Sequence, residues 1–228
     1  FTEVTVHDTI TVTETVTMEA QGVKKMANIP DQDRLLRVIS AAWQAFARFG
    51  YQKTSIQDIA TLACVSKSVV FKYFQSKENL YRSVFRLAAD AIAEADAKAD
   101  AGEIEPSDVF MALRRRIGAR MELFYRSPYV YSFSYAAAYE KDSLARELVQ
   151  EEFARRGVTE ASAERYTGIR RDVSPIKAKQ MIFWVSQGFL EDQLSRGLAK
   201  PDDLQKEYQE WIDTLELLLK ERSVDQDA

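Results

Sequence analysis

The chain has 228 residues, of which 46% are hydrophobic and 29% are charged, and its formal net charge is −4. This composition excludes a chain that is disordered as a whole, and the small numbers of glycines (8) and prolines (5) favour long helices. With one cysteine and one histidine, an intrachain disulfide is excluded and a zinc site is not expected, so we predict no metal and no cofactor. No apolar run approaches the roughly 20 residues that span a bilayer, and no signal peptide is visible. We therefore expect a cytoplasmic protein without membrane contact.

Positive charge is concentrated in one part of the chain. Residues 34–86 carry nine lysines and arginines against two acidic residues, a net charge of +7, which leaves −11 for the rest of the chain. A basic module on an acidic body is the electrostatic pattern of a DNA-binding domain joined to a domain with another role.

The first 17 residues differ in pattern from everything that follows. Valine and isoleucine occupy even-numbered positions and alternate mostly with threonine, which is strand-like spacing. We interpret residues 1–30 as an extended or disordered N-terminal arm. The alternative is an arm that adds a strand or contacts DNA, although the absence of lysine and arginine before Lys24 argues against DNA contact by the first 20 residues.

The first predicted helix covers residues 33–49. Its apolar residues recur at helical spacing and form one core face, which consists of Leu35, Ile39, Ala42, Phe46 and Phe49. Gly50 follows directly and is expected to end the helix as a left-handed cap.

Residues 54–81 predict two short helices, a tight turn between them and the start of a third helix. Ser55 and Asp58 have the spacing of a capping box. Ser66 and Ser76 are placed to cap the second and third helices, and the turn falls at residues 63–65. This order is that of a helix-turn-helix, whose second helix is the type that enters the major groove of DNA.

The same stretch resembles the DNA-binding signature of the TetR family of bacterial regulators. Five groups match in register, namely Thr54-Ser55-Ile56, Ile59-Ala60, Val65-Ser66-Lys67, Tyr73-Phe74 and Ser76-Lys77-Glu78. With the preceding helix, the resemblance covers residues 33–82. It implies an all-α fold with an N-terminal three-helix helix-turn-helix DNA-binding domain, placed at residues 31–82, and a C-terminal helical domain for ligand binding and dimerisation, placed at residues 83–223.

The resemblance and the position of the second helix predict ten DNA-binding residues, which are Thr54, Ser55, Ser66, Lys67, Ser68, Val69, Phe71, Lys72, Tyr73 and Lys77. Lys67 and Lys72 can reach guanine or phosphate. Tyr73, Lys77 and Thr54 match family positions that hold the DNA backbone, a role that fixes register and carries no sequence information.

Several positions depart from the family pattern. Val69 and Phe71 stand where the family more often has a small polar residue and a tyrosine, so they either contact thymine methyl groups or pack inside the protein. Ser68 stands where the family often has glycine. Cys64 replaces the family's turn glycine, and if that turn needs a positive φ, cysteine costs on the order of 1 kcal/mol. We interpret Cys64 as a small filler of the turn, with redox sensing as the alternative.

The rest of the chain is predicted to be helical. A long helix over residues 76–99 connects the two domains in the family. Further helical segments are predicted at residues 107–126, 141–156, 175–197 and 202–222. Residues 157–174 form a polar stretch, and residues 224–228 form a tail.

Aromatic residues cluster after Pro128, and five fall within eleven residues. They form either an aromatic core or the wall of a cavity for an apolar or aromatic ligand. Under the second interpretation the predicted ligand-binding residues are Phe110, Met121, Phe124, Tyr125, Tyr129, Phe133, Tyr135, Tyr139 and Trp184. The run Arg114-Arg115-Arg116 is interpreted as a solvated face, although one arginine could meet an anionic ligand.

The last two helices, at about residues 175–197 and 202–222, are apolar over more than one narrow stripe. By resemblance, such a pair forms a four-helix dimer interface. An isologous homodimer is also the simplest assembly that pairs two recognition helices, about 34–36 Å apart for adjacent turns of DNA.

These features predict a ligand-responsive, homodimeric transcriptional repressor that a small apolar or aromatic effector releases from a palindromic double-stranded DNA operator. A TetR-like activator is one alternative, and a helical interaction module with a merely structural helix-turn-helix is another. An enzyme is not expected, because the sequence shows no Ser/His/Asp arrangement, phosphate loop or metal-ligand set.

Overall fold

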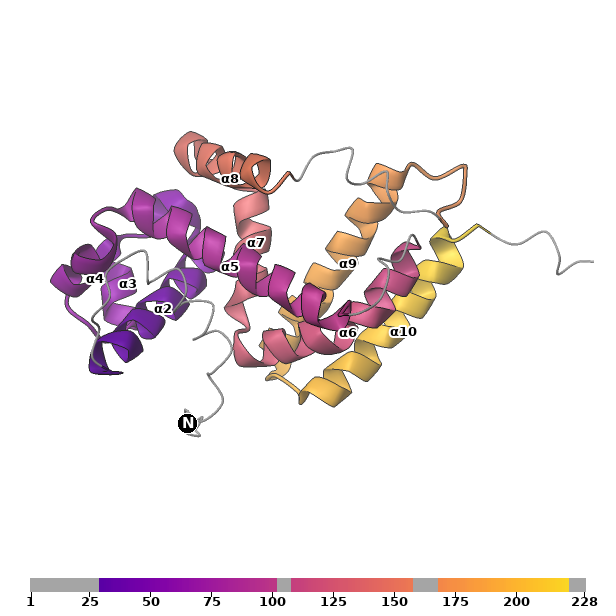
Figure 1. The fold of residues 1–228 in the computed structure, drawn as a ribbon, viewed down its shortest axis with the longest axis horizontal. Helices are drawn as coiled ribbons and strands as arrows, with labels where there is room; N and C mark the ends of the chain where they lie inside the picture. The colour runs from indigo at the N-terminus through magenta and orange to yellow at the C-terminus, as the bar shows by residue number, and fades with distance from the viewer. Residues whose placement is uncertain (1–28, 102–107, 158–167, 222–228) are drawn as a thin grey trace, which may run out of the picture. The chain divides into compact units, whose positions relative to one another are not determined.

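The computed structural model describes residues 29–101, 108–157 and 168–221. Over these ranges the chain forms nine α-helices, and its extended segments make no strand beyond an isolated bridge between Ile169 and Lys220. The helices, shown in Figure 1, are α2 (Ile29–Lys53), α3 (Ile56–Leu62), α4 (Lys67–Phe74), α5 (Lys77–Ala99), α6 (Val109–Arg126), α7 (Tyr129–Ala138), α8 (Ser143–Arg155), α9 (Pro175–Arg196) and α10 (Pro201–Leu219). The predicted all-α fold is confirmed. Predictions for residues 1–28 and for the tail at 224–228 lie outside the described residues.

Helix α2 differs from its prediction at both ends. It begins at Ile29, four residues before the predicted start, and it runs past Gly50 to Lys53. Gly50 has the expected positive φ of 72°, but its ψ of 173° is not that of a left-handed helical cap. The glycine therefore kinks the segment, and one further turn leads into the helix-turn-helix.

The chain divides into two compact units, and each is described by itself. Unit 1 comprises Phe1–Ala93 and Arg126–Glu152, and unit 2 comprises Glu94–Tyr125 and Phe153–Ala228. Helices α2, α3, α4 and α7 thus belong to unit 1, and α9 and α10 belong to unit 2. The helix-turn-helix shares its unit with a helix that follows it by more than fifty residues.

An aromatic cluster forms the core of unit 1. The ring of Tyr81 on α5 lies edge-on to Phe46 on α2, with centroids 4.9 Å apart, and to Phe133 on α7, at 5.5 Å. Tyr51 joins from the last turn of α2, 5.0 Å from Tyr81. Because Phe46, Tyr81 and Phe133 are all fully buried, α7 completes the aromatic core of the unit that contains the helix-turn-helix.

Polar contacts also hold α7 and α8 to the rest of unit 1. Glu140, just after α7, accepts a hydrogen bond from the backbone N–H of Tyr51 at 2.8 Å. On α8, Glu152 is buried and pairs with Arg86 of α5 at 3.4 Å, and Glu151 pairs with Arg82 at 3.6 Å. A buried carboxylate requires such a partner, so this ion pair fixes how α8 lies on α5.

Unit 2 packs α6, α9 and α10 around an aliphatic and aromatic core. One face of α10 is buried throughout, with residues at helical spacing: Leu204, Tyr208, Ile212, Leu215 and Leu219. The hydroxyl groups of Tyr208 and Ser186 are hydrogen-bonded, which joins α10 to α9. Phe110 and Phe124 of α6 are also fully buried.

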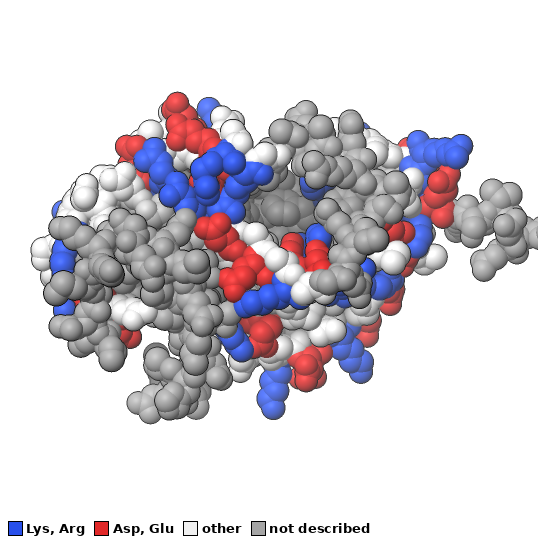
Figure 2. Space-filling view, in the orientation of Figure 1, with Lys and Arg blue, Asp and Glu red and all other residues white. Residues whose placement is uncertain are grey.

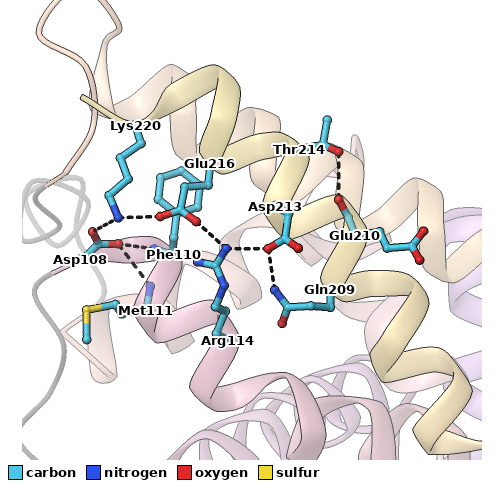
Figure 3. A network of polar contacts seen from close by, with 10 residues as sticks. All are labelled: Asp108, Phe110, Met111, Arg114, Gln209, Glu210, Asp213, Thr214, Glu216 and Lys220. Atoms are coloured by element: carbon cyan, nitrogen blue, oxygen red, sulfur yellow. Dashed lines mark hydrogen bonds and ion pairs between the residues drawn. The ribbon is translucent and has the colours of Figure 1, made fainter. Parts of the chain in front are cut away.

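Arginine–carboxylate pairs join the helices of unit 2 to one another. The Arg114 guanidinium contacts Asp213 and Glu216 of α10, and Lys220 bridges Glu216 to Asp108 (Figure 3). Figure 2 shows lysine and arginine side chains lying beside aspartate and glutamate side chains on one face of the molecule.

The second and third arginines of the run are paired as well. Arg116 donates two hydrogen bonds to Asp100, at 2.8 and 2.5 Å, and only 11% of its side chain is exposed. Arg115 lies 3.9 Å from the same carboxylate. The expectation that residues 114–116 form a solvated face is therefore wrong, because Asp100, directly after α5, and acidic residues of α10 lie opposite them in the fold.

Both α9 and α10 carry large apolar side chains on a second, exposed face. Trp184 is 49% exposed and Trp211 is 46% exposed, and further exposed apolar residues are Ile176, Met181, Phe183, Leu217 and Leu218. Gly188 lies on α9, and a Cβ atom added to it would meet nothing within 4 Å. No helix in the described ranges has the length and apolar character needed to cross a membrane.

Candidate DNA-binding site

The first helix of the helix-turn-helix is fixed at its start by the predicted capping box. The Asp58 N–H donates to Ser55 Oγ at 3.1 Å, and the Ser55 N–H donates to Asp58 Oδ2 at 2.9 Å. Hydrogen bonds to the carboxylate from the side chain of Ser55 and from its backbone N–H lower the pKa of the Asp58 carboxyl. Ile56, Ile59 and Ala60 are buried, so α3 has the single apolar face that its sequence predicts.

The turn between α3 and α4 has the backbone strain expected where a residue other than glycine occupies a position of positive φ. Cys64 has a φ of 52°, in the region that favours glycine. Arg37 of α2 supports this turn, because its guanidinium donates to the backbone carbonyls of Ala63 at 2.9 Å and Cys64 at 3.5 Å. The sequence did not single out Arg37 for this role.

Helix α4 presents one buried and one exposed face. Val70 is buried at 1% exposure, whereas Lys67, Ser68, Phe71 and Lys72 are exposed. The spacing places the exposed side chains on the face turned away from the core. The exposed face of α4 can thus contact a DNA groove while the buried face keeps its packing against the core.

Ser66 stands at the N-terminal cap position of α4 but makes no capping hydrogen bond with its side chain. Its hydroxyl pairs instead with the hydroxyl of Ser68 at 2.8 Å. The prediction that Ser66 caps α4 through its side chain is therefore wrong, because the second serine offers a competing partner. Ser76, in contrast, does accept from the Asn79 N–H at 3.0 Å at the start of α5.

The two apolar departures from the family pattern have different surroundings. Phe71 is 40% exposed, and the Lys67 ammonium lies 5.7 Å from the centre of its ring. Val69 is half-buried. The ring of Phe71 is therefore not packed inside the protein and lies on the same exposed face of α4 as Lys67.

Tyr73 at the end of α4 is bound to the first turn of α2. Its hydroxyl donates to the carboxylate of Asp31 and lies 3.0 Å from the Asp31 carbonyl oxygen. The Lys72 ammonium is 3.3 Å from Asp31 Oδ2. Burial and the hydrogen bond to Asp31 raise the pKa of Tyr73 to about 12, and the same hydrogen bond lowers the pKa of Asp31.

The Lys77 side chain contacts the residues of α2 that directly follow the kink at Gly50. Its ammonium is 4.2 Å from the centre of the Tyr51 ring and 3.4 Å from the carbonyl oxygen of Gln52. Burial lowers the pKa of Lys77. This cation–π contact holds the side chain close to the protein surface at the start of α5.

Thr54 is buried, with 2% of its surface exposed. Its hydroxyl donates to the carbonyl oxygen of Gly50 at 2.8 Å and lies 3.2 Å from that of Ala45. In this structure the hydroxyl thus joins the kinked end of α2 to the segment that begins α3.

The residues predicted to bind a ligand fall in both units. Tyr129, Phe133, Tyr135 and Tyr139 lie at or beside α7 in unit 1, and the other five lie in unit 2: Phe110, Met121, Phe124, Tyr125 and Trp184. Phe133 belongs to the aromatic core of unit 1, and Tyr129 accepts a hydrogen bond from Gln44 at 3.0 Å. In unit 2, Phe110, Met121 and Phe124 are buried, whereas Tyr125 is 45% exposed.

Among the described residues, no three His, Cys, Asp or Glu side chains are grouped so that they could hold a metal ion. The groups that could meet a ligand on the helix-turn-helix are cationic, hydroxyl-bearing or aromatic. Such a set suits the phosphates and base edges of a nucleic acid.

Comparison with known proteins connects this region to bacterial regulators. Residues 38–84 match the sequence model described as bacterial regulatory proteins, tetR family. The HTH-type transcriptional regulator RutR of Escherichia coli K12 is 45% identical over 53 residues, which are 23% of this chain and 25% of RutR. The HTH-type transcriptional repressor KstR of Mycobacterium tuberculosis is 23% identical over 163 residues, 68% of this chain and 73% of KstR. The chain spans only 25% to 37% of the length of its first curated relatives.

Solved structures show the same fold over most of the chain. A TetR family transcription regulator from Marinobacter aquaeolei VT8 has a TM-score of 0.58 at 15% identity, covering 85% of this chain and 98% of that one. The regulator FadR of Bacillus subtilis, solved in complex with stearoyl-CoA, has a TM-score of 0.50 at 17% identity, covering 79% and 97%. These relatives are named as transcriptional regulators and not as enzymes.

Proposed function

We propose that this chain, whose residues 38–84 match the tetR family of bacterial regulatory proteins, is a ligand-responsive repressor that binds a palindromic DNA operator as a homodimer. The observation that carries this proposal is the exposed face of α4, where Lys67, Ser68, Phe71 and Lys72 project from a helix anchored by the buried Val70. The helix-turn-helix belongs to the part of the chain with a net charge of +7. Positive charge of this kind supplies the affinity for phosphate on which DNA binding depends.

In the proposed complex, α4 enters the major groove. Lys67 and Phe71 meet base edges, with the lysine on guanine and the ring on a thymine methyl group. Tyr73 and Lys77 contact phosphate and fix the register of the helix. The N–H groups at the starts of α3 and α4 are additional phosphate donors.

The homodimer is proposed to form through α9 and α10. These helices have one face in the core of unit 2 and a second face that exposes large apolar side chains, including Trp184 and Trp211. Tryptophans of this kind commonly anchor interfaces, and the open space at Gly188 permits close approach of a second helix. A two-fold dimer would present two copies of α4 to a palindromic site.

The effector is proposed to be a small apolar or aromatic molecule bound within residues 83–223, with residues 31–82 as the DNA-binding part. The buried aromatic side chains of α6 supply apolar surface for it, and the complex of FadR with stearoyl-CoA is a precedent within the same fold. The effector must bind the DNA-incompetent form of the dimer more tightly than the competent form, because otherwise it cannot shift the equilibrium. Helix α5 starts in unit 1 and ends in unit 2, so it is the natural connection between effector and DNA.

Alanine substitutions in α4 test the DNA-binding proposal. Lys67→Ala is expected to weaken binding to a selected operator by about tenfold or more, because it removes one cationic contact of roughly 1–3 kcal/mol. Lys72→Ala should act in the same direction. The matched control is Lys98→Ala, which removes the same charge from the end of α5 and should leave the affinity within about twofold. Unchanged affinity for both α4 variants, measured by fluorescence anisotropy, would contradict the docking.

The effector proposal is tested with the protein–operator complex and stearoyl-CoA as the first probe. Dissociation of the complex at micromolar acyl-CoA, without loss of the folded dimer, is the expected result. If stearoyl-CoA and a panel of smaller apolar and aromatic compounds all leave the complex intact, the proposed release mechanism is wrong.

A further inference from the structure

The contact between Asp31 and α4 has a consequence for the DNA-binding residues. Asp31 lies 42 residues before Tyr73 in the chain, yet its carboxylate accepts a hydrogen bond from the Tyr73 hydroxyl, and its Oδ2 is 3.3 Å from the Lys72 ammonium. The Lys72 ammonium also lies 5.6 Å from the centre of the Tyr73 ring. One carboxylate is thus bound by two neighbouring side chains that the proposed function assigns to DNA.

A tyrosine hydroxyl has one hydrogen, so it can donate to only one acceptor at a time. A carboxylate oxygen and a phosphate oxygen are both anionic acceptors and make the same kind of charge-assisted hydrogen bond. Tyr73 can therefore donate to a DNA phosphate only after it releases Asp31. Lys72 can keep both partners, but its charge is already partly neutralised.

We propose that Asp31 is an intramolecular competitor for DNA phosphate at Tyr73 and Lys72. This inference rests on the proposed function, because it assumes that these two side chains meet the DNA backbone. Asp31 adds a negative charge where phosphate arrives, and it occupies the donor that phosphate needs. The lowered pKa of Asp31 agrees with this role, since the carboxylate stays charged at neutral pH.

The competition acts on every duplex alike. Phosphate contacts carry no sequence information, so Asp31 lowers the affinity for operator and for unrelated DNA by the same factor. It leaves the ratio of specific to non-specific affinity unchanged.

The test uses Asp31→Asn, which removes the charge and keeps an acceptor for Tyr73, and Asp31→Ala, which removes both. Both variants are expected to bind operator and an unrelated duplex about three- to tenfold more tightly than the unmodified protein at low salt. The logarithm of the affinity should also fall more steeply with the logarithm of salt, by up to about one unit of slope. Because alanine cannot donate to phosphate, its gain would exclude a new hydrogen bond as the cause.

Asp33→Asn is the matched control. Asp33 lies on the same turn of α2, but it pairs with Arg37 at 3.1 Å instead of with α4. The control loses the same charge near the same helix start, so it corrects for the net charge and for the stability of α2. Its affinity for DNA should rise clearly less than that of the Asp31 variants.

Tyr73→Phe identifies the group through which Asp31 acts. In this background the gain from Asp31→Asn should shrink, because only the competition at Lys72 remains. If the unmodified protein binds DNA and neither Asp31 variant binds more tightly than the Asp33→Asn control, the inference is overturned and the proposed function stands. If neither the unmodified protein nor the variants bind any duplex, both are overturned.

Discussion

Each unit of the chain has its own core, and the two units differ in what those cores contain and in the apolar surface of their helices. In unit 1, which contains the helix-turn-helix, rings from α2, α5 and α7 pack in one aromatic core. In unit 2, the aliphatic core is supplemented by arginine–carboxylate pairs between helices, and two helices keep a second apolar face exposed. A rigid support suits a part that must present α4 in one orientation. An exposed apolar face suits a part that meets a second copy of the chain.

The largest expected effect comes from breaking the aromatic core of unit 1. Phe133→Ala removes a fully buried ring that touches Phe46, Tyr81 and Phe85. The loss of packing and the cavity left behind should lower the free energy of unfolding of this unit by about 3–5 kcal/mol. Tyr139→Ala is the control, because Tyr139 is 46% exposed and its loss should cost under about 1 kcal/mol. Native-state hydrogen exchange over a denaturant series measures the loss of unfolding free energy for each of the two variants. Equal losses for the two variants would show that α7 does not complete this core.

The exposed apolar face of unit 2 gives the next largest effect. Trp211→Glu places a charge on the exposed apolar face through which the dimer is proposed to form, so the dissociation constant of the dimer should rise by about 30-fold or more, as for the loss of an anchor worth at least 2 kcal/mol. The matched variant Leu144→Glu adds the same charge at an exposed apolar residue of α8 in unit 1. Sedimentation velocity should show monomers for Trp211→Glu and dimers for Leu144→Glu. Dimers for both would place the interface elsewhere.

The smallest effect concerns the ion pairs of unit 2 and depends on pH. A hydrogen bond from Arg114 lowers the pKa of Asp213 below its ordinary value of 3.8. For Glu216 burial acts in the opposite direction, but hydrogen bonds from Lys220 and Arg114 outweigh it and lower the pKa below 4.5. Both carboxylates therefore stabilise the fold fully above about pH 4.5, and this contribution is lost as the pH falls through their folded-state values.

Arg114→Gln measures this contribution. At pH 7 it should lower the melting temperature by about 2–4 °C, and the difference from the unmodified protein should shrink as the pH falls below the ordinary pKa values of the two carboxylates, because the stabilisation from the pairs is then progressively lost. Lys98→Gln is the control, since Lys98 forms an exposed i,i+4 pair with Glu94 and its loss should change the melting temperature by less than about 1 °C. A difference for Arg114→Gln that stays constant from pH 7 to pH 3 would contradict the assignment.

The helix-turn-helix could be predicted from the sequence because its determinants are local. The capping box at Ser55 and Asp58, the apolar face of α3 and the positive φ of Cys64 all depend on residues within a few positions of one another. Helices α9 and α10 were also predicted within about three residues at each end, since their periodic apolar residues continue over many turns.

Contacts between distant segments could not be predicted in this way. Nothing in the sequence pairs Asp31 with Tyr73, because a carboxylate in a first helical turn normally needs no partner beyond the helix end. The place of Phe133 in the core beneath the helix-turn-helix depends on how α7 folds back onto α2, and helical periodicity does not contain this information. The run of arginines has the pattern of a solvated face for the same reason, since Asp213 and Glu216, the partners of Arg114 on α10, lie 99 and 102 residues further along the chain.

The most direct test of the account is the number of chains that bind one selected duplex. Purified protein is used to select binding sequences from a random pool of duplex DNA. The molar mass of its complex with the selected duplex is then measured by analytical ultracentrifugation over a salt series. The account predicts a palindrome, two chains per duplex and an affinity that falls steeply as salt rises. A single chain per duplex, or no enriched sequence at any salt concentration, would contradict it.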